Sequence, residues 1–392
     1  MAQKRALLDL SKEELAELLA AWGQPRYRLN QIWRWLYVSM VSEIDQMRNL
    51  PAALRTQLGG QFVVTSVSPL RRQRSADGHT EKVLLELADG QAVETVLMDY
   101  DGRRTVCVSS QVGCALHCAF CATGLGGWNR NLSAGEIVEQ VLYFARLSRG
   151  GSRTAPTERT APTERTAPTE RTAPTEPTAP TERTAPAAPA QPITHVVYMG
   201  MGEPFLNYEA VRQSIAILND PEGFALGVRR VTVSTAGIVP GIERLGREGL
   251  PIGLAVSLHA PTDELRNRLV PINRKYPLAQ LIAACQAYIE RTHRRVTFEY
   301  ALIDGVNDAP AHADALARLL GGMLCHVNLI PVNPVADLPY LPSPQERVVA
   351  FEGRLRERGI NATLRVSRGA DIQAGCGQLR GSPRECETLV SA

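Results

Sequence analysis

The stretch CALHCAFC at residues 114–121 places three cysteines at spacings of four and three residues. A loop that carries thiols at these spacings is able to wrap around a metal centre. Four-iron clusters are normally held by four cysteines, so three would leave one iron open to an outside ligand. Structural zinc needs four nitrogen or sulfur ligands, and His117, the candidate fourth, adjoins Cys118 and is poorly placed to reach the same ion. Free buried thiols are a third alternative. The pattern favours the cluster.

Around this loop, short apolar strands alternate with amphipathic helices from about residue 105 onward. Six β–α units predict a parallel α/β fold with right-handed crossovers. A full barrel has eight units, so an open or partial barrel is expected, although periodicity alone does not separate it from a doubly wound sheet. The predicted strands span residues 105–110, 193–199, 230–235, 252–258, 296–302 and 326–331.

Glycines and polar residues follow four of these strands. Barrel enzymes place their chemistry at the carboxyl ends of the strands. Glycine lets the backbone approach a ligand, and a glutamate there is able to accept from an ammonium group. Each loop alone is unremarkable, but together they predict a ligand-sized rim made of Met199–Pro204, Ser234–Gly237, Ser257–His259 and Pro331–Pro334.

The first 95 residues are expected to form an accessory region of helices followed by a short β-hairpin. The segment SKEELAELLAAW begins with a serine cap and a glutamate three residues later. Helices are also predicted at residues 28–37 and 51–58, and Asp89-Gly90 is a typical hairpin turn. Residues 96–380 would form the core, and residues 381–392 a tail.

Residues 151–192 have a composition unlike the rest of the chain. The hexamer RTAPTE repeats from Arg153, with many prolines and no aromatic or branched aliphatic side chain. Such a tract has little to bury, and X-Pro steps favour extended backbone. We therefore expect a disordered spacer inserted into the core.

The overall composition is that of an ordinary soluble protein. The chain has 392 residues, a formal net charge of +3 and eight cysteines, which excludes a small disulfide scaffold and a strongly basic nucleic-acid binder. No run approaches the ~18 apolar residues of a membrane helix, and the N-terminus turns acidic too early for a signal peptide. A cytoplasmic location without membrane association is expected.

The cysteine triplet, with Phe120 before its last cysteine, resembles the radical S-adenosylmethionine (SAM) superfamily. The rest of the chain outside the repeat closely resembles the bacterial adenine-C2 methyltransferases of 23S rRNA and tRNA. This resemblance implies a partial (β/α)6 barrel and a 4Fe–4S cluster held by Cys114, Cys118 and Cys121, with SAM on its open iron. The matching strings are Glu94-Thr-Val, Cys107–Cys114, Asn129–Leu132, Gly202–Pro204, Ser257–His259, Asn333-Pro334 and Ala374–Leu379.

The resemblance also implies a two-stage reaction. One SAM methylates Cys376, and a second, cleaved by the cluster, yields a radical that removes hydrogen from this methyl group. The methylene radical adds to adenine C2, and Cys107 releases the product through a transient disulfide with Cys376. Glu94 matches the family's proton acceptor. The implied SAM contacts are Gly202, Glu203, Ser234, Ser257, Leu258, His259 and Asn333.

Simple chemistry agrees with this route. Adenine C2 is electron-poor and has no useful nucleophilicity, whereas a thiolate is readily methylated by SAM. Cys107 and Cys376 could instead be structural thiols, since cysteine often packs as a small hydrophobe. Cys376 lies in Gly-Cys-Gly, a flexible segment unsuited to core packing.

The resemblance implies 23S rRNA and tRNA as partners, an electron donor such as flavodoxin with its reductase, and a monomer. RNA contact is expected from local basic and aromatic residues, because arginine pairs with phosphate and aromatic rings stack on bases. Alternatively, Trp33 and Tyr37 belong to the core of the accessory region. The candidates are Arg26, Tyr27, Arg28, Trp33, Arg34, Trp35, Arg71, Arg72 and Arg74.

Two other functions fit part of the sequence. The related enzymes that methylate C8 of rRNA adenine and confer antibiotic resistance share the cluster loop and the paired cysteines. A non-catalytic RNA-binding module stabilised by zinc would explain the triplet but not the residues at the strand ends. Mass spectrometry of the modified nucleosides would distinguish the C8 enzymes, since they form 8-methyladenosine and not 2-methyladenosine. A protein that contains zinc and no iron would be the RNA-binding module.

Overall fold

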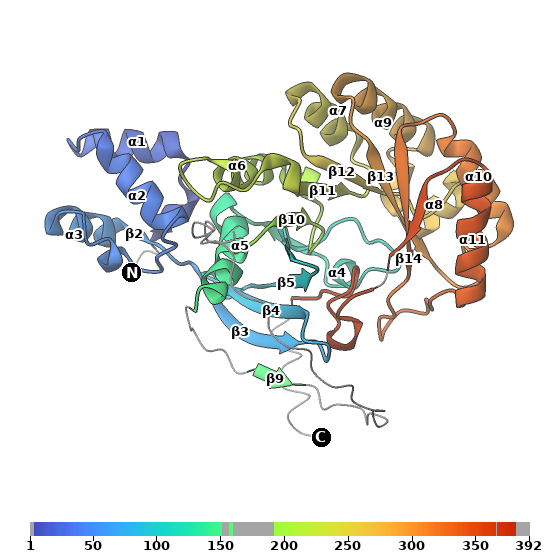
Figure 1. The fold of residues 1–392 in the computed structure, drawn as a ribbon, viewed down its shortest axis with the longest axis horizontal. Coiled ribbons are helices and arrows are strands. Elements are labelled where there is room, and N and C mark those ends of the chain that lie inside the picture. Colours follow the sequence, from blue (N-terminus) through green and yellow to red (C-terminus); the bar gives the residue numbers. More distant parts are fainter. Residues whose placement is uncertain (1–3, 151–156, 160–191, 366, 382–392) are drawn as a thin grey trace, which may run out of the picture.

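A computed structural model describes residues 4–150, 157–159, 192–365 and 367–381. Figure 1 shows the N-terminal helices at one end of the molecule and the helices of the C-terminal half at the other, joined by one long sheet. The sheet has eleven strands in the order β15-β14-β13-β12-β11-β10-β6-β5-β4-β3-β9.

Seven parallel strands form the barrel part of this sheet. All six predicted strands are present, and a seventh, β15, was not predicted. The strands follow one another in chain order without the reversal that marks a doubly wound sheet, so the partial barrel is confirmed. They are β6 (Arg103–Cys107), β10 (His195–Tyr198), β11 (Val231–Thr235), β12 (Gly253–Ser257), β13 (Val296–Leu302), β14 (Cys325–Pro331) and β15 (Ala362–Leu364).

Helices connect these strands and cover the outside of the barrel. Ser133 caps the first of them with a reciprocal bond to Glu136, which fixes where this helix starts. The long helices are α5 (Ala134–Ser148), α6 (Tyr208–Asn219), α7 (Val239–Glu248), α8 (Asp263–Leu269), α9 (Leu278–Thr292), α10 (Pro310–Leu320) and α11 (Gln345–Glu357). Short 3-10 turns lie at Leu7–Asp9, Ile44–Gln46, Pro204–Asn207, Val228–Arg230, Pro271–Arg274 and Ala370–Ile372.

Three antiparallel strands extend the sheet beyond β6. They are β3 (Val67–Arg74), β4 (Thr80–Leu87) and β5 (Ala92–Tyr100), and β5 pairs with β6. Gly90 has a φ of +79° in the predicted turn between β4 and β5, a conformation that favours glycine. The domain boundary expected at residue 95 falls inside β5, so the division of the chain stays a prediction.

The N-terminal helices pack against the barrel through its first helix. They are α1 (Lys12–Ala21), α2 (Tyr27–Tyr37) and α3 (Ala52–Gln61), with β1 (Arg5–Ala6) and β2 (Phe62–Val63) pairing beside them. The amide of Gly135 in α5 donates to Asp9 at 3.1 Å. Trp33 and Tyr37 are buried with their ring centroids 4.5 Å apart, so both belong to the core of this region.

Most of the repeat tract lies outside the described residues. Thr157–Arg159 forms β9, which pairs in parallel with β3, and residue 192 is also described. The predicted tail at 381–392 is described only at its first residue. Within the ranges described, none of the helices combines the length and apolar character that a bilayer span requires.

Candidate active site

The three cysteines of the triplet line one cavity at the carboxyl edge of the parallel strands. Cys114 follows β7 (Gln111–Gly113), and Cys121 is the N-cap of α4 (Ala122–Leu125). The loop between them is held by hydrogen bonds from Ala119 to Leu269 O at 2.9 Å and from Ala122 to Gly377 O at 2.7 Å. The main chain therefore sets the path of the cysteine loop.

The surroundings of these thiols fit a cluster better than a single zinc ion. His117 is not among the cavity-lining residues, and its Nδ1 lies 3.0 Å from Gly124 O. Across the described residues, no group of three or more His, Cys, Asp or Glu side chains is arranged around one ion. All three cysteines line one cavity, and three cysteines at one cavity suit a four-iron cluster with one iron left open.

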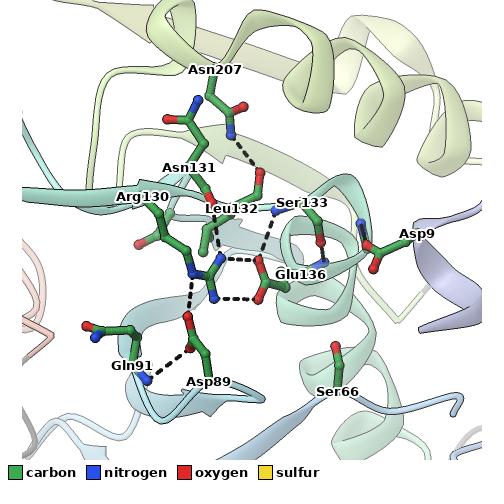
Figure 2. A network of polar contacts seen from close by, with 12 residues as sticks. Asp9, Ser66, Asp89, Gln91, Arg130, Asn131, Leu132, Ser133, Glu136 and Asn207 are labelled. Carbon is green, nitrogen blue, oxygen red and sulfur yellow. Dashed lines mark hydrogen bonds and ion pairs between the residues drawn. The ribbon is translucent and has the colours of Figure 1, made fainter. Parts of the chain in front are cut away.

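The segment that follows the cysteine loop is fixed by a charged network (Figure 2). Arg130, in β8 (Trp128–Asn131), donates to both carboxylate oxygens of Glu136 at 2.8 Å and to Asp89 at 2.6 Å. Asn207 donates to Leu132 O at 2.8 Å. The network joins the exit of the cysteine loop to the β4–β5 turn and to the start of α5.

Six of the seven implied SAM contacts line the same cavity. They come from the ends of successive strands, as the sequence predicts, and are Gly202, Glu203, Ser234, Ser257, His259 and Asn333. Leu258 does not line this cavity: it is fully buried, and its amide donates to Glu299 O at 3.0 Å.

Glu203 is a buried carboxylate held by main-chain amides. Phe205 donates to its Oε1 at 3.0 Å and Ala236 to its Oε2 at 2.7 Å. Burial raises the pKa of Glu203 to about 7, although these hydrogen bonds act in the opposite direction. An ammonium group bound beside it would favour the carboxylate form.

His259 is a neutral hydrogen-bond donor. The amide of Ala301 donates to its Nδ1 at 2.9 Å, so the proton of the neutral ring is on Nε2. Burial, with Arg266 nearby, lowers the pKa of His259 to about 3. The ring packs edge-on against Phe120 with centroids 4.7 Å apart, which links the SAM rim to the cysteine loop.

Arg266 was not predicted as a site residue, yet it ties together two loops of the rim. This side chain of α8 is fully buried. It donates to Leu258 O at 3.0 Å, Ala236 O at 2.7 Å and Ser257 O at 3.0 Å. The sequence analysis assigned nothing to this segment, DELRNRL, whose mix of charges is ordinary for an exposed helix and does not single out this arginine.

Cys376 lies at the junction of two cavities. It lines the cavity of the triplet and a second cavity that also contains Cys107. The residue is exposed to solvent, and the protein atoms packed around its sulfur raise the pKa of the thiol by desolvation. Asn333 donates to Cys376 O at 3.1 Å. A Cβ on Gly375 would lie 2.6 Å from Asn333 Nδ2, which explains why glycine precedes the cysteine.

Cys107 is buried and lines the second cavity together with Cys376. Burial raises the pKa of its thiol to about 12, and the neighbouring Cys376 adds to the effect. The Cys376 sulfur is thus close enough to disfavour the thiolate form of Cys107. Both thiols are free.

The second cavity carries a cationic and aromatic lining that sequence reasoning missed. Arg103, Arg365 and Arg368 line it together with Tyr100. The guanidinium of Arg368 lies 3.3 Å from the centre of the Tyr100 ring. The only sequence signal was that Arg365 and Arg368 lie shortly before Gly375-Cys-Gly.

Glu94 lines neither of these two cavities. Its Oε1 forms an ion pair with Lys82 at 2.8 Å, and its Oε2 accepts the Arg380 amide at 2.8 Å. The role of proton acceptor therefore stays a prediction.

The predicted RNA contacts differ in accessibility. Tyr27 is 56% exposed, and Arg28 lies over its ring. Trp35 donates to Asn49 at 2.5 Å, and Arg72 is paired with Glu81 at 2.5 Å. Arg26, Arg34 and Arg74 are exposed.

Comparison with known proteins identifies the family. A chain from Chloroflexus aurantiacus named "Probable dual-specificity RNA methyltransferase RlmN" is 46% identical over 97% of this chain and 93% of its own length. One of the same name from Moorella thermoacetica is 47% identical over 98% of this chain and 99% of its own. The chain belongs to the RlmN family. The prediction of a dual-specificity radical SAM RNA methyltransferase is confirmed over both alternatives.

Domain and structure comparisons agree with membership of the RlmN family. Residues 5–64 match the ribosomal RNA large subunit methyltransferase N-terminal domain, and residues 171–316 match the radical SAM superfamily. The crystal structure of a radical SAM methyltransferase from Sphaerobacter thermophilus is 50% identical, with a TM-score of 0.84 over 96% of this chain and all of that one. Radical SAM enzymes use a 4Fe–4S cluster and SAM, as predicted.

Proposed function

We propose that this protein methylates C2 of an adenine in 23S rRNA and in the anticodon loop of tRNA, with Cys376 as the carrier of the methyl group. The observation that carries the proposal is the place of Cys376 between two cavities. One cavity holds the three cysteines and the SAM rim, and the other is lined by arginines and by Cys107.

Cys114, Cys118 and Cys121 would hold the cluster, with SAM on the rim that contains Glu203 and His259. Bound there, the cluster supplies the electron that cleaves SAM to a 5′-deoxyadenosyl radical. Glu203 accepts a hydrogen bond from the amino group of SAM, and the fixed Nε2–H of His259 donates one.

Cys376 performs the transfer in three steps. Its thiolate attacks the methyl carbon of a first SAM, and S-adenosylhomocysteine leaves. The resulting S-methylcysteine loses a hydrogen atom to the radical, its methylene carbon bonds to adenine C2, and the C2 proton is lost. Cys107 then attacks the sulfur of Cys376 and forms a disulfide, which breaks the bond from that sulfur to the new carbon. The new carbon takes up a proton and becomes the methyl group, and the one remaining electron would return to the iron centre that the three cysteines hold.

The second cavity would receive the adenine. Arg365 and Arg368 are placed to pair with phosphates, and the base must leave its stack to reach Cys376. The fluorescence of 2-aminopurine at the target position should therefore rise when RNA binds. An unchanged signal would contradict base extrusion.

A protein donor such as flavodoxin with its reductase would supply the electrons to a cytoplasmic, monomeric enzyme. Leu125 and Trp128 are 54% and 50% exposed directly after the cysteine loop. Exposed Arg268 lies on α8, whose end accepts the Ala119 amide. These residues would suit an acidic carrier protein.

Replacing Trp128 with alanine tests this docking surface. Reduction by flavodoxin should slow about tenfold, while reduction by dithionite stays unchanged; Leu341→Ala, equally exposed elsewhere, is the control. If RNA affinity falls instead, the surface binds RNA and not the donor.

The central experiment is mass spectrometry of the tryptic peptide Gly369–Arg380, whose only cysteine is Cys376. Protein from iron-replete cells should carry one added methyl group on Cys376, and a Cys118→Ala variant none. Unmodified Cys376 in an enzyme that still methylates RNA would overturn the carrier role. Analysis of the modified RNA should yield 2-methyladenosine and no 8-methyladenosine.

A further inference from the structure

The segment that carries Cys376 is attached at both ends to one buried ion pair. Lys82 and Glu94 lie on the adjacent antiparallel strands β4 and β5, with side chains only 7% and 11% exposed. In the register of β4 and β5, Lys82 lies opposite Val96 and Glu94 lies opposite Leu84. The two charged residues are therefore diagonal neighbours on one face of the sheet. Their charged atoms are 2.8 Å apart.

Each member of the pair holds one end of the segment. Lys82 Nζ donates to Gln373 O at 3.2 Å, three residues before Cys376. Glu94 Oε2 accepts the amide of Arg380 at 2.8 Å, four residues after it. The span between these two attachments contains Gly375 and Gly377, and Gly377 has a φ of +83°.

The contacts within this span are made by other groups. Ala122 donates to Gly377 O at 2.7 Å, and Thr123 donates to Leu379 O at 2.7 Å. Gln378 donates to Pro334 O at 2.9 Å. These bonds tie the span to the cysteine loop and to the end of β14. Lys82 and Glu94 attach its two ends to the antiparallel sheet, and just before the span Ala76 at the β3–β4 turn donates to Asp371 at 2.8 Å.

We propose that Lys82 and Glu94 are positioning residues that keep the sulfur of Cys376 at the junction of the two cavities. The proposal rests on the proposed function, because it assumes that Cys376 must reach both cavities. Fixed ends with glycines between them let the sulfur move locally without releasing the segment. Both carboxylate oxygens of Glu94 take part in this attachment, one through Lys82 and one through the Arg380 amide.

Hydrogen exchange tests the attachment without any catalysis. In the holoenzyme with Lys82→Met, amides within residues 373–380 should exchange at least tenfold faster than in the wild type. Lys82→Arg, which keeps the charge and a donor, should restore protection. Lys12→Met is the control: like Lys82, Lys12 joins two distant parts of the chain, here through the carboxylates of Asp220 and Glu222, and it lies away from this segment.

Catalytic readouts separate positioning from folding. Lys82→Met should keep its iron and form 5′-deoxyadenosine with dithionite, while methylation of Cys376 falls at least tenfold. A loss of iron together with faster exchange throughout the protein would indicate a merely structural pair and overturn the proposal. The proposal would also be overturned if Lys82→Met showed the same hydrogen exchange and the same methylation of Cys376 as the wild type.

Lys82→Met leaves the carboxylate of Glu94 buried without its partner, and this could prevent folding. A second variant avoids the problem. Lys82→Met/Glu94→Gln removes both charges and still offers an acceptor to the Arg380 amide. It should show fast exchange near Gln373 and the same methylation defect, and wild-type behaviour would contradict the proposal. If the wild type itself lacks the methyl group on Cys376, the proposed function is wrong. The hydrogen-exchange result still shows whether Lys82 and Glu94 hold the ends of the segment.

Discussion

The side-chain amide of Asn333 donates a hydrogen bond of 3.1 Å to the main-chain oxygen of Cys376. Asn333 also lines both cavities, and it follows β14 at the rim where SAM is expected. One side chain thus contacts the segment of the methyl carrier and the site of the methyl donor. Loss of this amide should affect both.

Asn333→Ala should slow methylation of Cys376 about fivefold and weaken SAM binding, because one hydrogen bond contributes about 1 kcal/mol. Labelled SAM measures the first effect and equilibrium binding the second. Asn361→Ala, at an exposed position, should match the wild type. Equal rates in all three proteins would show that Asn333 does not position Cys376.

Arg266→Met should destabilise the protein by roughly 3–5 kcal/mol, because three main-chain oxygens of the rim lose a buried charged donor. Urea unfolding measures this change. Arg268→Met, two residues away on the same helix and exposed, is the control and should stay within about 0.5 kcal/mol. Similar values for the two variants would refute the bridging role.

Glu139 should make stability depend on pH. Burial raises the pKa of this carboxyl in α5 to about 7, above its ordinary value of 4.5, although Ser66 donates to it at 2.7 Å. The folded state therefore binds the proton more tightly, and stability falls as pH rises from 4.5 to 7. Compared with Glu139→Gln, the wild type should lose roughly 3 kcal/mol of its free energy of unfolding as the pH rises from 4.5 to 7. A pH-independent difference would contradict the buried, protonated carboxyl.

Arg368→Ala should weaken RNA binding and lower the slope of log affinity against log salt by about 1, since one phosphate contact is lost. Binding of an rRNA fragment is measured between about 50 and 200 mM salt. Arg318→Ala, exposed on α10, is the control. If the salt dependence of RNA affinity is unchanged in Arg368→Ala, the RNA phosphates do not bind at Arg368 in the second cavity.

The sequence predicted what has a strong local pattern. Six apolar strands and the hairpin turn at Gly90 were found because burial and turn geometry leave periodic signals. The seventh parallel strand, Ala362–Leu364, has three residues and an exposed threonine at its centre, too short for any period to appear. The helix Gln345–Glu357 is rich in charge and was also missed.

Within the site, the residues that the sequence did not predict are those brought together only by the tertiary fold. The triplet and the strand-end residues were found because chain spacing alone brings them to one edge. Arg266 was missed because its helix pattern is that of an exposed face, while its three acceptors come from two other strands. Leu258 was expected at the cavity with its neighbours Ser257 and His259, but it is fully buried and does not line that cavity, and its amide extends the pairing of β12 with β13.

The sheet never closes on itself: β6, the first barrel strand, pairs with β5 and not with the last strand, β15. A closed barrel would admit to its interior only molecules small enough to pass through its mouth. An unclosed one has a lateral seam, and here the Cys376 segment runs between β5 and the end of β14. If the proposed function holds, a folded RNA many times wider than the barrel would need only to lay one nucleotide along that seam, and the size of the substrate would be uncoupled from the size of the reaction chamber.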